Sequence, residues 1–199
     1  MTRTMTSERI ERLREAIADY QASGKGTLFD HEAEEARAAV RSRALGLLDQ
    51  RGRSRHELRE RLIAAEFAPE VIDAVLDDFE RTGLINDEVF AREWVRQRHQ
   101  RRKKSARVLD LELQDKGVGA AERASALAQI DEDDEEATAI ELARKKARSV
   151  KNVPGDYAEY QKVLRRIVGV LARRGFNEAM SLRIARAELE RRREELAEG

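Results

Sequence analysis

The chain of 199 residues has no cysteine, only two prolines and few aromatic residues. Without cysteine it cannot form a disulfide, a zinc–thiolate site or a cysteine nucleophile. No stretch approaches the roughly 20 apolar residues that a membrane span needs, and the first residues contain no apolar run of the secretory type. We therefore expect a cytoplasmic monomer that has no membrane contact.

What the chain has in abundance is charge. Charged residues make up 39% of it, hydrophobic residues 41% and aromatic residues 5%, and alanine supplies much of the apolar part. This mixture of Ala, Leu, Glu and Arg favours an all-α fold. The 39 basic and 39 acidic residues give a formal net charge of zero. Only the local distribution of charge can therefore indicate a partner.

The first thirty residues differ from the rest of the sequence. We predict that residues 1–30 form a partly flexible N-terminal extension. Residues 23–27 (SGKGT) resemble the end of a phosphate-binding loop, but Asp19 stands where that loop requires a glycine, and no strand precedes it. A linker is the better interpretation of this string.

Three helices are predicted between residues 31 and 83. The first begins near Ala33 and ends at Gly52. The second begins at a capping box, in which Ser54 and Glu57 each satisfy a free backbone N–H group. The third begins at Pro69, which the first turn of a helix tolerates, and stops at Gly83.

The same plan recurs twice along the chain. The end of each second helix has a leucine followed, five residues later, by another apolar residue: Leu62 and Phe67, Leu113 and Val118, Leu171 and Phe176. A third helix is predicted after each anchor, over residues 69–82, about 119–130 and about 177–193. We predict three tandem three-helix repeats, at residues 31–83, 84–131 and 132–199, in an elongated, curved arrangement.

The middle repeat contains a dense basic turn between two helices. Asn86 and Ser105 are good N-caps, and Gly117 is a good C-terminal stop. Phe90 and Trp94 fall on the apolar stripe of the first helix, so we interpret them as core residues and not as a base-stacking platform. Residues 96–107 contain seven Lys and Arg side chains.

Motifs for catalysis or metal binding are missing. His31, His56 and His99 are far apart, and there is no nucleophile elbow and no dinucleotide-binding glycine fingerprint. The acidic run at residues 131–136 lacks the spacing of an EF-hand loop and is typical of a solvated helix start. We therefore predict that the protein is not an enzyme and uses no metal or cofactor.

The sequence resembles the RecX family of RecA regulators. The resemblance covers residues 36–120 well, and the third repeat more loosely through residues 171–176. The segments that carry it are Ala44-Leu45 with Leu48, Arg51, Arg53-Ser54, Glu57-Leu58, residues 67–72 with Val75-Leu76, residues 83–87 with Phe90-Ala91, Glu112-Leu113 and residues 116–118. Two departures are Glu66, where a glycine is expected, and Lys104-Ser105, which replaces a commoner glycine.

The resemblance implies a mainly negative regulator that binds in the groove, or at the end, of the RecA–single-stranded DNA filament. It implies inhibition of ATP hydrolysis, strand exchange and co-protease stimulation, with a role in the SOS response and DNA repair. For the filament or DNA contact we single out two basic turns: Arg98, Arg101, Arg102, Lys103, Lys104 and Arg107, and Arg51, Arg53, Arg55 and Arg59. A free-standing DNA-binding protein and a structural helical adaptor remain alternatives.

Overall fold

A computed structural model describes Arg14 and residues 31–198. The predicted extension at residues 1–30, apart from Arg14, lies outside the described residues, and so does the loop-like string at residues 23–27. Within residues 31–198 every regular element is an α-helix. The all-α prediction is therefore confirmed.

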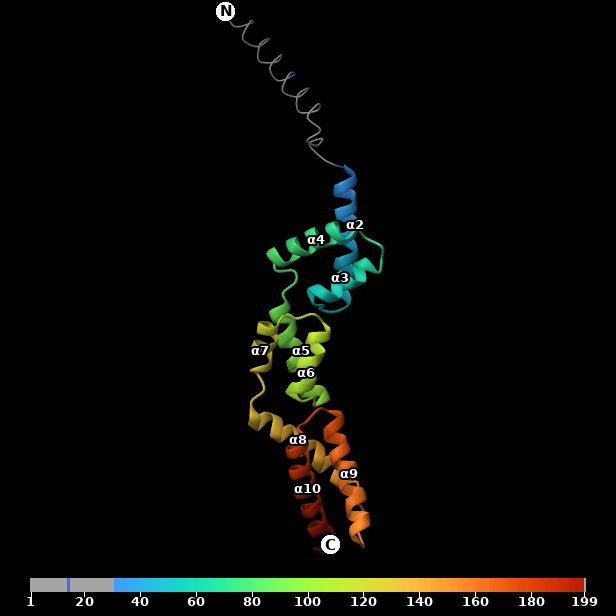
Figure 1. The fold of residues 1–199 in the computed structure, drawn as a ribbon, viewed down its shortest axis with the longest axis vertical. Helices are drawn as coiled ribbons and strands as arrows, with labels where there is room; N and C mark the ends of the chain where they lie inside the picture. The colour runs from blue at the N-terminus through green and yellow to red at the C-terminus, as the bar shows by residue number, and fades with distance from the viewer. Residues whose placement is uncertain (1–13, 15–30, 199) are drawn as a thin grey trace, which may run out of the picture.

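The helices follow one another in three groups of three. They are α2 (His31–Gln50), α3 (Arg55–Ile63), α4 (Pro69–Arg81), α5 (Asp87–Arg102), α6 (Ala106–Asp115), α7 (Ala120–Leu127), α8 (Glu132–Ala147), α9 (Tyr157–Arg173) and α10 (Glu178–Glu198). Figure 1 shows these triplets along one long axis, from α2–α4 at the N-terminal end to α8–α10 at the C-terminal end. The predicted tandem repeats in an elongated arrangement are present, and the boundaries 31–83, 84–131 and 132–199 remain our proposed division.

Side-chain caps fix where most of these helices begin. The Ser54 hydroxyl accepts a hydrogen bond from the Glu57 N–H at 3.1 Å, and Asn86 accepts one from the Val89 N–H at 2.9 Å. Asp131 caps α8 in the same way, so the acidic run is a helix start. Each cap satisfies a backbone donor that the first turn leaves free.

The three anchors end their helices with the same turn. Glu66, Gly117 and Gly175 have φ angles of 64°, 69° and 84°, in the left-handed region. Just after each of them a backbone N–H donates back to the anchor leucine, from Phe67 to Leu62 at 3.3 Å, from Val118 to Leu113 at 3.1 Å and from Phe176 to Leu171 at 3.3 Å. This is the Schellman turn. Glu66 thus adopts the backbone conformation for which a glycine was expected.

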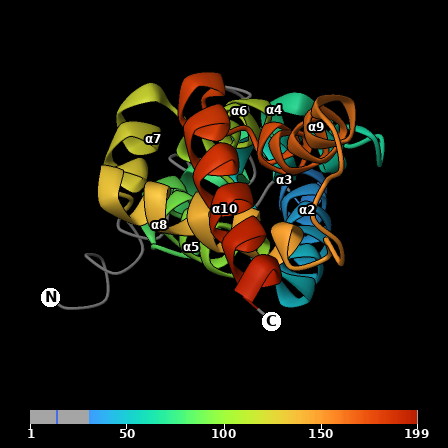
Figure 2. The ribbon, with the colours of Figure 1, turned by 90° about the horizontal axis from the view of Figure 1, so that it is seen from below.

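Each triplet buries its own apolar cluster. Leu62, Leu113 and Leu171 are fully buried at the centres of the first, second and third clusters, respectively. A view along the long axis shows the triplets lying over one another (Figure 2). Because no single cluster runs through the chain, the relative positions of the triplets depend on the contacts where two triplets meet.

Candidate interaction surface and the junctions between repeats

The first junction joins the beginning of α3 to the end of α6. The Ser54 hydroxyl, fully buried, donates to the Lys116 carbonyl at 2.6 Å. The Arg55 backbone N–H donates to the Asp87 carboxylate at 2.9 Å. A Cβ on Gly117 would overlap the His56 side chain. Gly117 is therefore needed both for its positive φ and for the close approach of the two triplets.

The second junction repeats this design one triplet further on. The Ser105 N–H donates to the Arg174 carbonyl at 3.0 Å, and the Ala106 N–H donates to the Glu135 carboxylate at 2.9 Å. A Cβ on Gly175 would overlap Val108. In both junctions the positive N-terminal end of one second helix meets the negative C-terminal end of the next, which is a favourable alignment of dipoles.

Glu57 fastens the first junction electrostatically. Its carboxylate accepts two hydrogen bonds from Arg51, at 2.8 and 3.0 Å, and one from Lys116 at 2.7 Å. Burial alone would raise the pKa of the Glu57 carboxyl, but these hydrogen bonds outweigh it and lower the pKa from 4.5 to about 2. Glu57 therefore remains ionised, and it joins the first triplet to the second. In a capping box the Glu57 carboxylate would instead accept a hydrogen bond from the backbone N–H of Ser54.

Trp94 lies in the same network and is covered by cations. The Arg98 guanidinium carbon is 3.3 Å from its ring centre, and the Lys116 ammonium is 4.2 Å away. Its indole N–H donates to Glu112 at 3.0 Å, and Phe90 packs at 5.5 Å. Both aromatic rings are only partly buried and pack against the second cluster. Because its ring is occupied within the chain, Trp94 offers no free stacking platform.

The basic turn of the second triplet divides into paired and unpaired cations. Arg98 lies 3.1 Å from Glu112, which also pairs with Lys104, and Lys103 pairs with Glu141 of α8 at 2.8 Å. The remaining members form no hydrogen bond or ion pair through their side chains within the described part of the chain, and all are exposed. They are Arg101, Arg102 and Arg107.

The basic turn of the first triplet is fully engaged. Arg53 is only 5% exposed and donates to the Leu47 carbonyl at 2.9 Å. Its burial, together with the neighbouring positive charges, lowers the pKa of the Arg53 guanidinium. Two further members pair through exposed contacts that water and salt screen: Arg55 with Asp77 and Glu80 at 2.7 and 2.6 Å, and Arg59 with Asp73 at 2.8 Å.

No sequence motif predicts these partners. Arg51 and Lys116 converge on Glu57, and Arg98 and Lys104 converge on Glu112, across separations that no motif marks. The only sequence signal was the abundance of carboxylates, which is too general to assign pairs. The ten predicted contact residues therefore differ in availability: seven are bound within the chain, and three have no side-chain partner among residues 31–198.

A pocket of about 520 Å³ lies beside the first junction. Its lining includes the exposed apolar side chains of Leu84 and Val89, together with Phe90 and Trp94. Among the described residues there is no cluster of potential metal ligands. In that same part of the chain no helix has the length and apolarity to cross a membrane.

Fold and surface together define a class: an all-α protein of tandem three-helix repeats with basic corners between the helices. Comparison with known protein families identifies which family of this class the chain resembles. The profile for "RecX, first three-helix domain" matches residues 41–79, and that for "RecX, second three-helix domain" matches residues 86–127. The chain belongs to the RecX family.

Individual relatives support this assignment. The chain is 55% identical over 192 residues to the regulatory protein RecX of Corynebacterium efficiens, covering 94% of this chain and 91% of that protein. It is 42% identical over 151 residues to the regulatory protein RecX of Streptomyces coelicolor, covering 76% and 78%.

Two solved structures share the fold. The crystal structure of RecX from Lactobacillus salivarius superposes with a TM-score of 0.65 at 23% identity, over 79% of this chain and 98% of that one. A second crystal structure of regulatory protein RecX gives 0.63 at 24% identity, over 80% of this chain and 79% of that one.

Proposed function

We propose that this protein is a negative regulator of the RecA recombinase that acts by binding the RecA–single-stranded DNA filament. The observation that carries the proposal is the 55% identity to a protein named regulatory protein RecX over almost the whole chain. The activity is binding and not catalysis: filament contact restrains ATP hydrolysis, strand exchange and co-protease stimulation. We place the protein in the cytoplasm, as a monomer.

The proposed contact surface is the corner between α5 and α6. Arg101, Arg102 and Arg107 are exposed there, and none has to break an ion pair with another described residue before it binds phosphate or a carboxylate of RecA. Arg98 packs on the Trp94 ring, so we assign it to shaping this corner, whereas the buried Arg53 shapes the turn before α3 in the first triplet. The elongated array of triplets fits a partner that presents repeated subunits along a groove.

The test is ATP hydrolysis by the cognate RecA on single-stranded DNA while this protein is titrated in. We expect inhibition well below one protein per RecA subunit, because end-capping or promoted disassembly affects many subunits at once. Replacing Arg101, Arg102 and Arg107 together with Gln should weaken inhibition about tenfold. The control variant replaces with Gln three arginines that are also exposed and form no ion pair with a described residue, Arg43, Arg61 and Arg186, and it should inhibit as the wild type does.

Two results would contradict the proposal. No inhibition by the stoichiometric wild-type protein would favour the structural adaptor or the free-standing DNA-binding protein, which a salt-dependent DNA-binding assay separates. Equal loss of inhibition in the corner variant and the control variant would remove the α5–α6 corner from the contact surface. Circular dichroism of both variants checks that they fold.

A further inference from the structure

We propose that the third triplet carries a binding site for the phosphate backbone of single-stranded DNA, centred on Lys146, Lys151 and Arg166. The proposal rests on the proposed function, since it names a DNA contact within the filament. It adds a surface that lies outside both basic turns. The site lies between the end of α8, the loop that follows it and the middle of α9.

The site is a pocket whose charges are all of one sign. Its volume is about 300 Å³, and its lining is Lys146, Ser149, Val150, Lys151, Asn152, Val163, Arg166 and Ile167. No carboxylate lines it. Within the described part of the chain, none of its three cationic side chains forms a hydrogen bond or ion pair. Such cations gain more from a phosphate than cations that are already neutralised.

The surrounding segment is strongly basic. Between residues 142 and 174 there are ten basic residues, namely Arg144, Lys145, Lys146, Arg148, Lys151, Lys162, Arg165, Arg166, Arg173 and Arg174, against two acidic ones, Asp156 and Glu159. Both carboxylates are engaged by backbone groups at the start of α9: Asp156 accepts from the Glu159 N–H, and Glu159 from the Gly155 N–H. Two carboxylates offset only part of the charge of ten basic residues, so the segment keeps a large positive excess.

A stripe of cations leads from the pocket towards the α5–α6 corner. Lys162, Arg166 and Arg173 are exposed and separated by four and seven residues, so they share one face of α9. At the end of this helix the Arg174 side chain donates to the carbonyl of Arg102. A 17-residue helix is about 25 Å long, enough to pass several phosphates.

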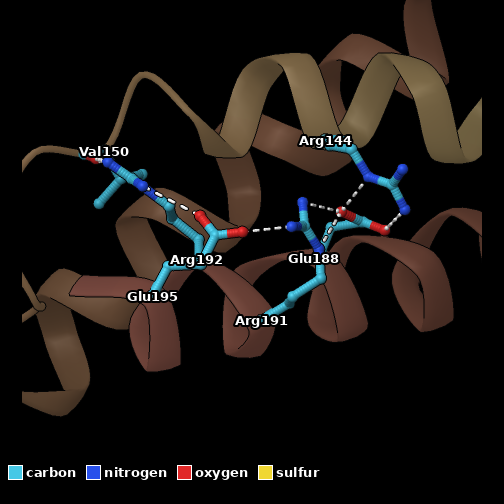
Figure 3. A network of polar contacts seen from close by, with 6 residues as sticks. All are labelled: Arg144, Val150, Glu188, Arg191, Arg192 and Glu195. Carbon is cyan, nitrogen blue, oxygen red and sulfur yellow. Dashed lines mark hydrogen bonds and ion pairs between the residues drawn. The ribbon is translucent and has the colours of Figure 1, made fainter. Parts of the chain in front are cut away.

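Side chains of α10 contact the loop and the helix that carry the pocket. The Val150 carbonyl, immediately before Lys151, accepts two hydrogen bonds from Arg192, each of 3.1 Å, and Arg192 is itself paired with Glu195 at 3.0 Å (Figure 3). In the same network Glu188, only 6% exposed, joins Arg144 of α8 to Arg191 of α10. These contacts fix the backbone of the loop that carries Lys151, which lowers the entropy cost of ordering that loop on binding.

Nucleic acid fits this surface better than an acidic protein does. A row of cations along α9, unpaired among the described residues, suits a single strand, whose successive phosphates meet cations in turn. The centres of protein–protein interfaces are instead depleted of lysine.

The test measures the anisotropy of a labelled oligo(dT) with the full-length protein and without RecA. We expect the variant with Lys151→Gln and Arg166→Gln to bind with a Kd about tenfold higher than wild type. The plot of log K against log salt has a negative slope, and its magnitude should be smaller by about 1.4 in this variant, since each phosphate contact with a single strand contributes about 0.7. The control variant, with Arg43→Gln and Arg61→Gln, removes the same charge from unpaired exposed positions and should stay within about twofold of wild type.

Several results would overturn the site. The first is that the wild type does not bind oligo(dT), and the second is that both variants lose the same affinity for oligo(dT). The third is that the site variant loses binding to polyglutamate but still binds oligo(dT). The last result would assign the surface to an acidic protein. RecA ATPase inhibition, measured in parallel, separates the two proposals. Inhibition by wild type without DNA binding removes only the site, and DNA binding through Lys151 and Arg166 without inhibition removes only the proposed function.

Discussion

Glu57 is the residue at which the first junction can be tested most directly. Glu57→Gln keeps the shape of the side chain but removes the charge that Arg51 and Lys116 contact. The full shift of the Glu57 pKa, from 4.5 to about 2, corresponds to roughly 3 kcal/mol at 1.36 kcal/mol per unit. Because the site is only partly buried and solvent screens it, we expect the free energy of unfolding to fall by about 2 kcal/mol at pH 7.

The pH dependence gives the same prediction an independent check. The folded-state pKa of Glu57 is lower than its unfolded value, so its contribution is complete above pH 4.5 and is lost as the pH falls towards 2. The difference between wild type and Glu57→Gln should therefore shrink from about 2 kcal/mol at pH 7 to about 1 kcal/mol or less at pH 3.

Urea denaturation followed by circular dichroism, at pH 7, 5, 4 and 3, measures this difference. The matched control is Glu60→Gln, an exposed carboxylate on the same helix α3 that forms no ion pair within the described residues. It should change the free energy of unfolding by less than about 0.5 kcal/mol at every pH. An effect of Glu57→Gln no larger than that of the control, or one that does not vary with pH, would mean that the Glu57 charge does not stabilise the first junction.

Two further predictions concern the turns that end the second helices. Glu66→Gly should raise the free energy of unfolding by about 0.5–1 kcal/mol in urea denaturation, because a non-glycine residue at φ 64° is strained. A lower free energy of unfolding would mean that contacts of the Glu66 side chain outweigh the strain of its backbone. Gly175→Ala should lower the free energy of unfolding by about 2 kcal/mol or more, since the new Cβ would overlap Val108. The control is Gly83→Ala, at φ 74° with open space around it, which should cost only about 1 kcal/mol from backbone strain. Equal losses in the two variants would rule out close packing at the second junction.

Local sequence patterns were enough to predict where most helices begin and end. Ser54, Asn86 and Ser105 were predicted as caps and do cap their helices, and the repeated leucine anchors end in the same turn three times. These features depend on contacts three to five residues apart, so a local pattern is enough to specify them. Glu66 shows that the repeat overrides one unfavourable residue, because packing within the triplet requires the turn.

The tertiary structure alone decided which cations are available. Arg55 pairs with Asp77 and Glu80, Lys103 with Glu141, and Lys116 with Glu57, 59 positions away. With 39 basic and 39 acidic residues, every arginine has many carboxylates within reach in sequence, and only the packed triplets select one. Coulomb attraction acts through space and falls with distance, so charge pairing follows the positions that packing creates and not the order of the chain.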